Sequence, residues 1–133
     1  MTASIIYLGG LRCRATHLQS GTVAETDAPT DNRGKGEKFS PTDMLCVSLA
    51  TCVLTTIAIK ANDMNIDLKD TKADITKHML KDPRRVGQVD ITINFPALSL
   101  NDEQKLTLEN TGNNCPVAKS LDADLKQNIT YNW

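Results

Sequence analysis

The stretch SPTDMLCVSLATCVLTTIAIKAN, residues 40–62, decides the fold. Ser40 is a preferred N-cap residue, Pro41 suits the first helical position, and Asp43 occupies the place of a capping-box acid. After Asp43, no charged residue follows until Lys60. A helix that is apolar around its whole circumference is typically buried on all sides. We therefore predict a long, buried helix around which the rest of the chain is arranged.

The composition indicates a single soluble domain over residues 1–133. A net charge of −1 and an aromatic content of 4% leave no basic face for phosphates and no aromatic platform for bases, so nucleic acid is not an expected partner. The uncharged run at residues 44–59 is shorter than the roughly 20 residues that span a bilayer, so no membrane partner is expected. The N-terminus lacks the basic segment of a signal peptide, which predicts a cytoplasmic protein with reduced cysteines.

Hydrophobic patterning predicts the element order β-β-β-α-β-β-α-α-β, an α+β fold in which the long helix lies on a sheet. Asn101 opens a second helix with a capping box, Gly112 is its expected stop, and Pro116 begins a third helix. Residues 27–38 form a long polar loop of the kind that often carries function. The expected strands are residues 4–8, 11–18, 22–26, 71–79, 86–95 and 128–133, and the expected helices are residues 40–62, 101–111 and 116–125.

Cys52 lies in the middle of the apolar helix, where burial raises the pKa of a thiol and makes it unreactive. A nucleophile at this position needs a cation from elsewhere in the chain. Arg12 and Arg14 in the first hairpin and Arg33 in the polar loop are the candidates, and the sequence does not choose among them.

Cys115 precedes Pro116 at the expected N-cap of a short helix, where amide donors and the helix dipole favour a thiolate. Both Cys52 and Cys115 also have a plain explanation as small core residues. Cys46 lies about 120° from Cys52 around the helix, so these two cannot bridge, and Cys46 is expected to be a core residue. Cys13 has one histidine four residues away and no second ligand pair, so neither a metal nor a cofactor is expected.

Three motifs resemble those of the OsmC/Ohr family of osmotically inducible and organic-hydroperoxide-resistance proteins. They are SPTDML at residues 40–45, SLATC at residues 48–52 and NCPV at residues 114–117. The similarity extends to TDAP at residues 26–29 and ITYNW at residues 129–133, and it is closer to the general OsmC-like branch than to classical Ohr. The resemblance implies an intertwined homodimer in which two long helices pack back to back, flanked by sheets from both chains.

The resemblance also implies a thiol-dependent peroxidase. Cys52 would attack the O–O bond of an organic hydroperoxide, or of hydrogen peroxide, and become a sulfenic acid. Cys115 would condense with it to a disulfide, which an external dithiol reduces. The apolar flank of Cys52 suits an organic hydroperoxide better than hydrogen peroxide.

The chain departs from the classical Ohr pattern at the activating residues. Those proteins carry a glutamate directly after the motif proline, which orients an arginine on the reactive thiol. Here Thr42 holds that position and Asp43 follows it, while Arg12 is the nearest match to the arginine although Leu11 separates it from the glycine pair. Arg12 and Asp43 are thus the candidate activating pair, and Asp43 has a sufficient explanation as a helix cap.

Two other functions fit the same fold. A dimeric binding protein would hold a small apolar or electrophilic ligand in a preformed cavity near Cys52, with little turnover. A purely structural, stress-related dimer would keep Cys52 and Cys115 farther apart than the roughly 7 Å between Cα atoms that a disulfide allows.

Overall fold

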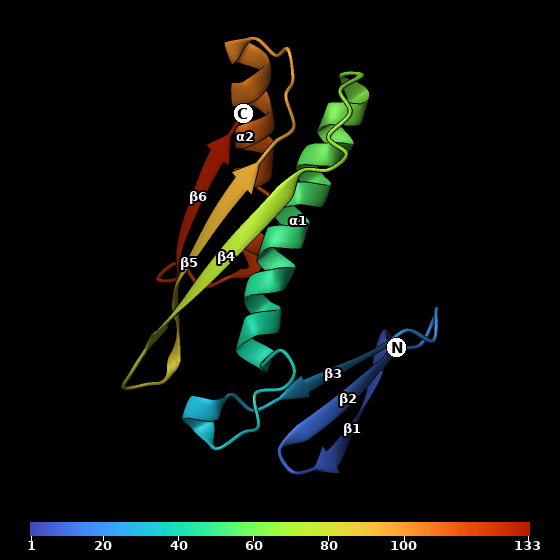
Figure 1. Ribbon diagram of the computed structural model, residues 1–133, viewed down its shortest axis with the longest axis vertical. Coiled ribbons are helices and arrows are strands. Elements are labelled where there is room, and N and C mark those ends of the chain that lie inside the picture. The colour runs from blue at the N-terminus through green and yellow to red at the C-terminus, as the bar shows by residue number, and fades with distance from the viewer. The chain divides into compact units, whose positions relative to one another are not determined.

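The predicted order of strands and helices is confirmed in a computed structural model, which describes residues 1–133 (Figure 1). One 3-10 turn, η1 (Thr30–Asn32), is added within the polar loop. The chain divides into two compact units, Met1–Leu45 and Cys46–Trp133. The strands are β1 (Ala3–Gly9), β2 (Arg12–His17), β3 (Val23–Asp27), β4 (Lys72–Leu80), β5 (Arg85–Asn94) and β6 (Lys126–Asn132). The helices are α1 (Pro41–Asp63), α2 (Asp102–Asn113) and α3 (Pro116–Ser120).

The first unit is built on an antiparallel sheet in the order β1-β2-β3. The turn around residues 19–21 sets the register of β2 and β3, which places Arg12 opposite Asp27. Successive side chains of a strand point to opposite faces of a sheet. Ile5 and Ile6 of β1 therefore lie on different faces, yet both are exposed, at 71% and 59%. Neither face of β1 is covered within this chain.

The start of α1 carries the predicted capping box. The Ser40 hydroxyl accepts a hydrogen bond from the Asp43 backbone N–H at 3.0 Å, and the Asp43 carboxylate accepts one from the Ser40 N–H at 2.8 Å. Ser40 is buried. Two backbone donors at the start of the helix are thereby satisfied reciprocally.

Replacing Ser40 by alanine is expected to lower the free energy of unfolding by about 1 kcal/mol, because it removes the acceptor for one of these donors. Urea denaturation monitored by circular dichroism measures the change. Ser99 is exposed, so Ser99→Ala is the matched control and should change stability little. Equal stabilities of the two variants would contradict the capping role.

The second unit is built on a sheet in the order β4-β5-β6, in which β4 and β5 are antiparallel and β5 and β6 are parallel. The central strand β5 has one buried face and one polar face, as its alternating sequence predicts. Figure 1 shows α1 and α2 running alongside this sheet. The fully buried aliphatic side chains of this unit come from α1, α2 and β5, and they are Leu49, Val53, Ile57, Val89, Ile91, Ile93 and Leu108.

Within one chain, α1 is buried on one side only, which differs from the prediction of burial on all sides. The buried residues of α1 lie on one face, whereas Thr51, Thr55 and Ile59 share another face and are exposed, Ile59 at 61%. By length and a mean hydropathy of 1.9, α1 is able to cross a membrane. This is weak evidence, because the core helix of a soluble protein meets the same criteria.

Two helix ends differ from the prediction. Gly112 lies inside α2 rather than beyond it, and Asn114 is the C-cap. A Cβ at residue 112 would come within 2.7 Å of the Ile57 side chain and 2.9 Å of the Tyr131 hydroxyl. The glycine therefore permits close packing and does not stop the helix. The third helix ends at Ser120, earlier than the predicted residue 125.

Candidate active site

The second unit brings Cys52 and Cys115 together. Cys52 extends from α1, and Cys115 is the N-cap of α3, as its place before Pro116 predicts. Cys52 and Cys115 lie close enough for each to shift the pKa of the other, and both cysteines are free thiols. Cys46 is 2% exposed, in agreement with its expected place in the core.

Neutral donors lower the pKa of Cys52. Burial on its own raises the pKa of this thiol, but hydrogen bonds from the Val117 backbone N–H, the Cys115 thiol and the Thr56 hydroxyl oppose it. The balance leaves the pKa of Cys52 below its ordinary value. Hydrogen bonds to the charged form of an acid stabilise that form. Cys52 is therefore the thiol of this pair that ionises first.

The pKa of Cys115 is shifted in the opposite direction. Burial raises it, the Ala118 N–H lowers it, and the neighbouring Cys52 sulfur raises it further. Cys115 is fully buried, and its sulfur accepts from the Ala118 N–H at 3.4 Å. The sequence-based expectation was therefore wrong for both thiols. For Cys52, the expectation did not include the Val117 N–H in the first turn of α3, which lowers its pKa. For Cys115, complete burial next to the Cys52 sulfur raises the pKa more than the N-cap position lowers it.

Tyr131 of β6 lies near Cys115, whose charge contributes to its pKa. Its hydroxyl donates to the Asn113 side chain at 2.8 Å and contacts the Glu109 carbonyl. Burial, together with the negative charges of Glu109 and of the Cys115 thiolate, raises the pKa of Tyr131 to about 12. The phenol is therefore neutral near neutral pH.

Arg12 is held by two carboxylates in the first unit. Its Nε and Nη2 donate to the two oxygens of Asp27 at 2.6 and 2.9 Å, and Nη2 also donates to Glu37 at 2.8 Å. Asp27 is 1% exposed, and the Arg12 guanidinium holds the pKa of its carboxyl below the ordinary value. The predicted arginine thus has acidic partners, but they are Asp27 and Glu37 rather than Asp43. Asp43 is the capping residue of α1.

The partner of Arg12 could have been found from the sequence. The turn at residues 19–21 fixes the register of the second hairpin, and counting back from it places Asp27 opposite Arg12. Opposite charges at facing positions of an antiparallel pair attract each other. The other two candidate arginines lie elsewhere, because Arg14 pairs with Glu25 and Arg33 is the C-cap of η1.

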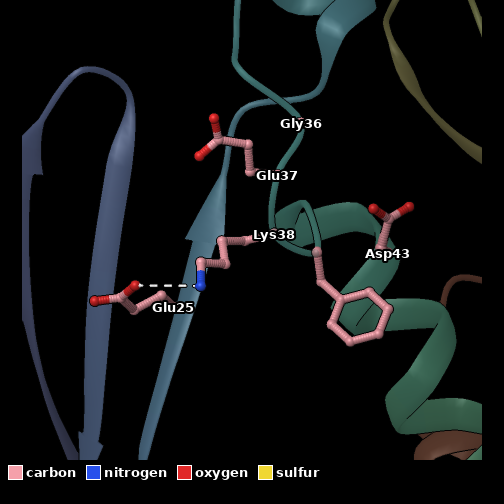
Figure 2. Close-up of a pocket in the computed structure, with 6 residues that line it drawn as sticks. Glu25, Gly36, Glu37, Lys38 and Asp43 are labelled. Carbon is pink, nitrogen blue, oxygen red and sulfur yellow. Dashed lines mark ion pairs between the residues drawn. The ribbon is translucent and has the colours of Figure 1, made fainter.

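A cavity of about 470 Å³ opens in the first unit (Figure 2). Figure 2 shows Lys38 directed toward Glu25, and these two form an ion pair at 3.8 Å. The cavity is lined by Glu25, Gly36, Glu37, Lys38, Phe39 and Asp43. A smaller cavity of about 230 Å³ in the second unit is lined by Leu54, Thr55, Ala58, Leu68, Asp70 and Thr71. Cys52 lines neither cavity, so neither is the ligand pocket expected of a binding protein.

The model of the OsmC-like protein family matches residues 34–130, which include both cysteines of the pair. No match is found among curated protein sequences.

Solved structures with a similar fold cover almost the whole chain. A protein from Psychrobacter arcticus 273-4, described as an osmotic stress induced and detoxification response protein, is 50% identical with a TM-score of 0.95, and the match covers 99% of this chain and 96% of that protein. The organic hydroperoxide resistance protein OsmC of Legionella pneumophila is 16% identical with a TM-score of 0.77, covering 100% and 98%. The organic hydroperoxide resistance protein OhrB of Bacillus subtilis is 18% identical with a TM-score of 0.68, covering 99% and 98%.

Proposed function

Because this chain belongs to the OsmC-like protein family, we propose that it is a thiol-dependent peroxidase that reduces organic hydroperoxides. The observation that carries the proposal is the proximity of Cys52 and Cys115, each of which shifts the pKa of the other, in opposite directions. A lowered pKa supplies the thiolate, which is the nucleophilic form of cysteine. Cys115, a buried thiol that keeps its proton next to Cys52, is suited to the second step, in which the disulfide forms.

The reaction takes two steps and returns to the start with a reductant. The Cys52 thiolate attacks one oxygen of the hydroperoxide, the O–O bond breaks, and the alkoxide leaves and takes up a proton to become an alcohol. Cys52 is then a sulfenic acid. The Cys115 sulfur attacks the Cys52 sulfur, an S–S bond forms, and water leaves. An external dithiol reduces the disulfide and is itself oxidised to a disulfide.

Relatives of the same fold support the substrate class, since the Legionella pneumophila and Bacillus subtilis proteins are organic hydroperoxide resistance proteins. The resemblance adds Arg12 to the proposal as the arginine that the family places at its reactive thiol. In this chain Asp27 and Glu37 fix its orientation. Asp43 contributes to the proposed site indirectly, because it caps α1, the helix that carries Cys52. We further propose that both units act as one domain, in the cytoplasm, where a dithiol is available.

A catalytic assay with cumene hydroperoxide and a dithiol tests the proposal. Peroxide is expected to be consumed in proportion to the enzyme, with one dithiol oxidised for each peroxide. Negligible consumption of several alkyl hydroperoxides and of hydrogen peroxide, with the protein folded and its thiols reduced, would overturn the peroxidase proposal.

We propose that the active form is a homodimer. Two exposed surfaces of this chain support it, namely the uncharged face of α1 with Thr51, Thr55 and Ile59, and the two open faces of β1 with Ile5 and Ile6. A short chain rarely leaves this much apolar surface in contact with water. A second copy is the simplest cover for both surfaces, because most soluble oligomers are homodimers.

The substitution Ile59→Asp is expected to raise the dimer dissociation constant by at least about a hundredfold, because it places an unpaired charge in the proposed interface. Sedimentation or light scattering across a concentration series measures the change. Leu106 of α2 is similarly exposed, at 58%, and Leu106→Asp is the control that should leave the constant unchanged. A wild-type protein that is monomeric at high concentration would contradict the dimer.

A further inference from the structure

The hydroxyl of Thr56 in α1 has a different kind of partner from the hydroxyls of Thr51 and Thr55 in the same helix. Thr51 and Thr55 donate to carbonyls one turn back, those of Val47 and Thr51, each at 2.8 Å. The Thr56 hydroxyl makes no such bond. Its contact is the sulfur of Cys52, 4.0 Å away, a distance at the outer limit for hydrogen bonds to sulfur.

The environment of Thr56 also differs from that of its neighbour. Thr55 is exposed, whereas Thr56 is half-buried, and its four-residue spacing from Cys52 places the two side chains on one face of the helix. Threonine in a helix usually returns its hydroxyl to the backbone, as Thr51 and Thr55 do here. A half-buried hydroxyl that forgoes this bond needs another partner.

We propose that Thr56 is a positioning residue for Cys52: its hydroxyl donates a hydrogen bond to the Cys52 sulfur and stabilises the thiolate. The inference rests on the proposed function and adds a residue to its site. A thiolate accepts hydrogen bonds more strongly than a thiol does, so the donor favours ionisation. It also fixes the sulfur on the side of α1 that faces Cys115.

Within the second unit, the other groups that face the Cys52 sulfur are neutral. They are the Val117 N–H from the first turn of α3 and the Cys115 thiol, which is the one titratable group among them. Tyr131 of β6 lies near Cys115 rather than Cys52, and its pKa is raised to about 12. Thr56 is therefore the one side chain other than Cys115 that can supply a proton donor to this sulfur within the second unit. Its loss should be visible in the titration of Cys52.

The test is the pH dependence of Cys52 alkylation by iodoacetamide in the full-length, reduced protein. A Cys46→Ala background leaves Cys52 as the one cysteine of the tryptic peptide 39–60, so mass spectrometry of that peptide reports this thiol alone. Thr56→Val removes the hydroxyl at nearly constant shape, Thr56→Ser retains it, and Thr55→Val is the matched control on the exposed face. Circular dichroism checks that each variant is folded.

Thr56→Val is expected to raise the midpoint of alkylation by about 0.5–1 pH unit, and to slow alkylation near neutral pH about three- to tenfold. Thr56→Ser and Thr55→Val should keep the wild-type midpoint. Should Thr56→Val not fold, Thr56→Ala removes the same hydroxyl and carries the same expectation. An unchanged midpoint in the folded variant lacking the hydroxyl, or a shift equal to that of Thr55→Val, overturns the proposal. Because alkylation uses no peroxide, this outcome is distinct from a failure of the peroxidase assay.

Discussion

The substitution Cys52→Ser is expected to reduce dithiol-dependent consumption of cumene hydroperoxide by at least about a thousandfold, to the background of the assay. A serine hydroxyl in place of the thiolate is not ionised near neutral pH and does not attack the O–O bond. The rate of peroxide loss in the presence of dithiol measures the effect. We expect the serine variant to remain folded, because the side chain is nearly isosteric and Cys52 is only partly buried.

Two further cysteine variants separate the roles. Cys46→Ala removes another thiol of the same helix, one that is buried and does not contribute to the pKa shift of Cys52, and it should retain turnover. Cys115→Ser should retain a single turnover, since Cys52 can still be oxidised, but lose steady turnover, since no disulfide forms. Full activity of Cys52→Ser, or equal losses in Cys52→Ser and Cys46→Ala, would contradict the assigned nucleophile.

The substitution Ile57→Ala is expected to lower the free energy of unfolding by about 2–5 kcal/mol, the range for large-to-small changes in a core. Ile57 is fully buried on α1, and its side chain lies against Gly112 of α2. The loss combines buried apolar surface with a cavity that rigid neighbours do not fill. Denaturant unfolding at constant protein concentration measures it.

The close approach of Ile57 to Gly112 allows a double-mutant test of whether these two residues share the same space. Gly112→Ala should cost about 1–3 kcal/mol on its own, because its Cβ would overlap the Ile57 side chain. In the Ile57→Ala background the same change should cost less, since the space has been opened. Strictly additive losses would show that the two residues do not share this space. Leu106→Ala, at an exposed position of α2, should change stability little.

The sequence predicted the order of elements because the signals were local. Ser40 and Asp43 form the capping box that their spacing requires, and the alternation in β5 marks its buried face. Gly112 was misinterpreted because a glycine near a helix end has two explanations, a left-handed cap and close packing. Which one holds depends on Ile57, a residue more than fifty positions earlier in the chain.

The site was predicted less completely, for a related reason. The sequence identified Cys52 and Cys115 through the motifs, but it assigned the lower pKa to Cys115 from its N-cap position alone. Burial and the contact between the two sulfurs decide the pKa values, and both depend on how α1 meets the first turn of α3. Val117 was not identified because its contribution is a backbone N–H, which leaves no mark in the side-chain sequence.

Thiol counting with disulfide mapping after one equivalent of cumene hydroperoxide tests the central claim most directly. The reduced protein has four free cysteines. The account predicts that two thiols are lost per chain and that peptide mapping finds a Cys52–Cys115 disulfide, which a dithiol reverses. Retention of all four thiols, or a disulfide that joins Cys13 or Cys46 to another residue, would contradict it.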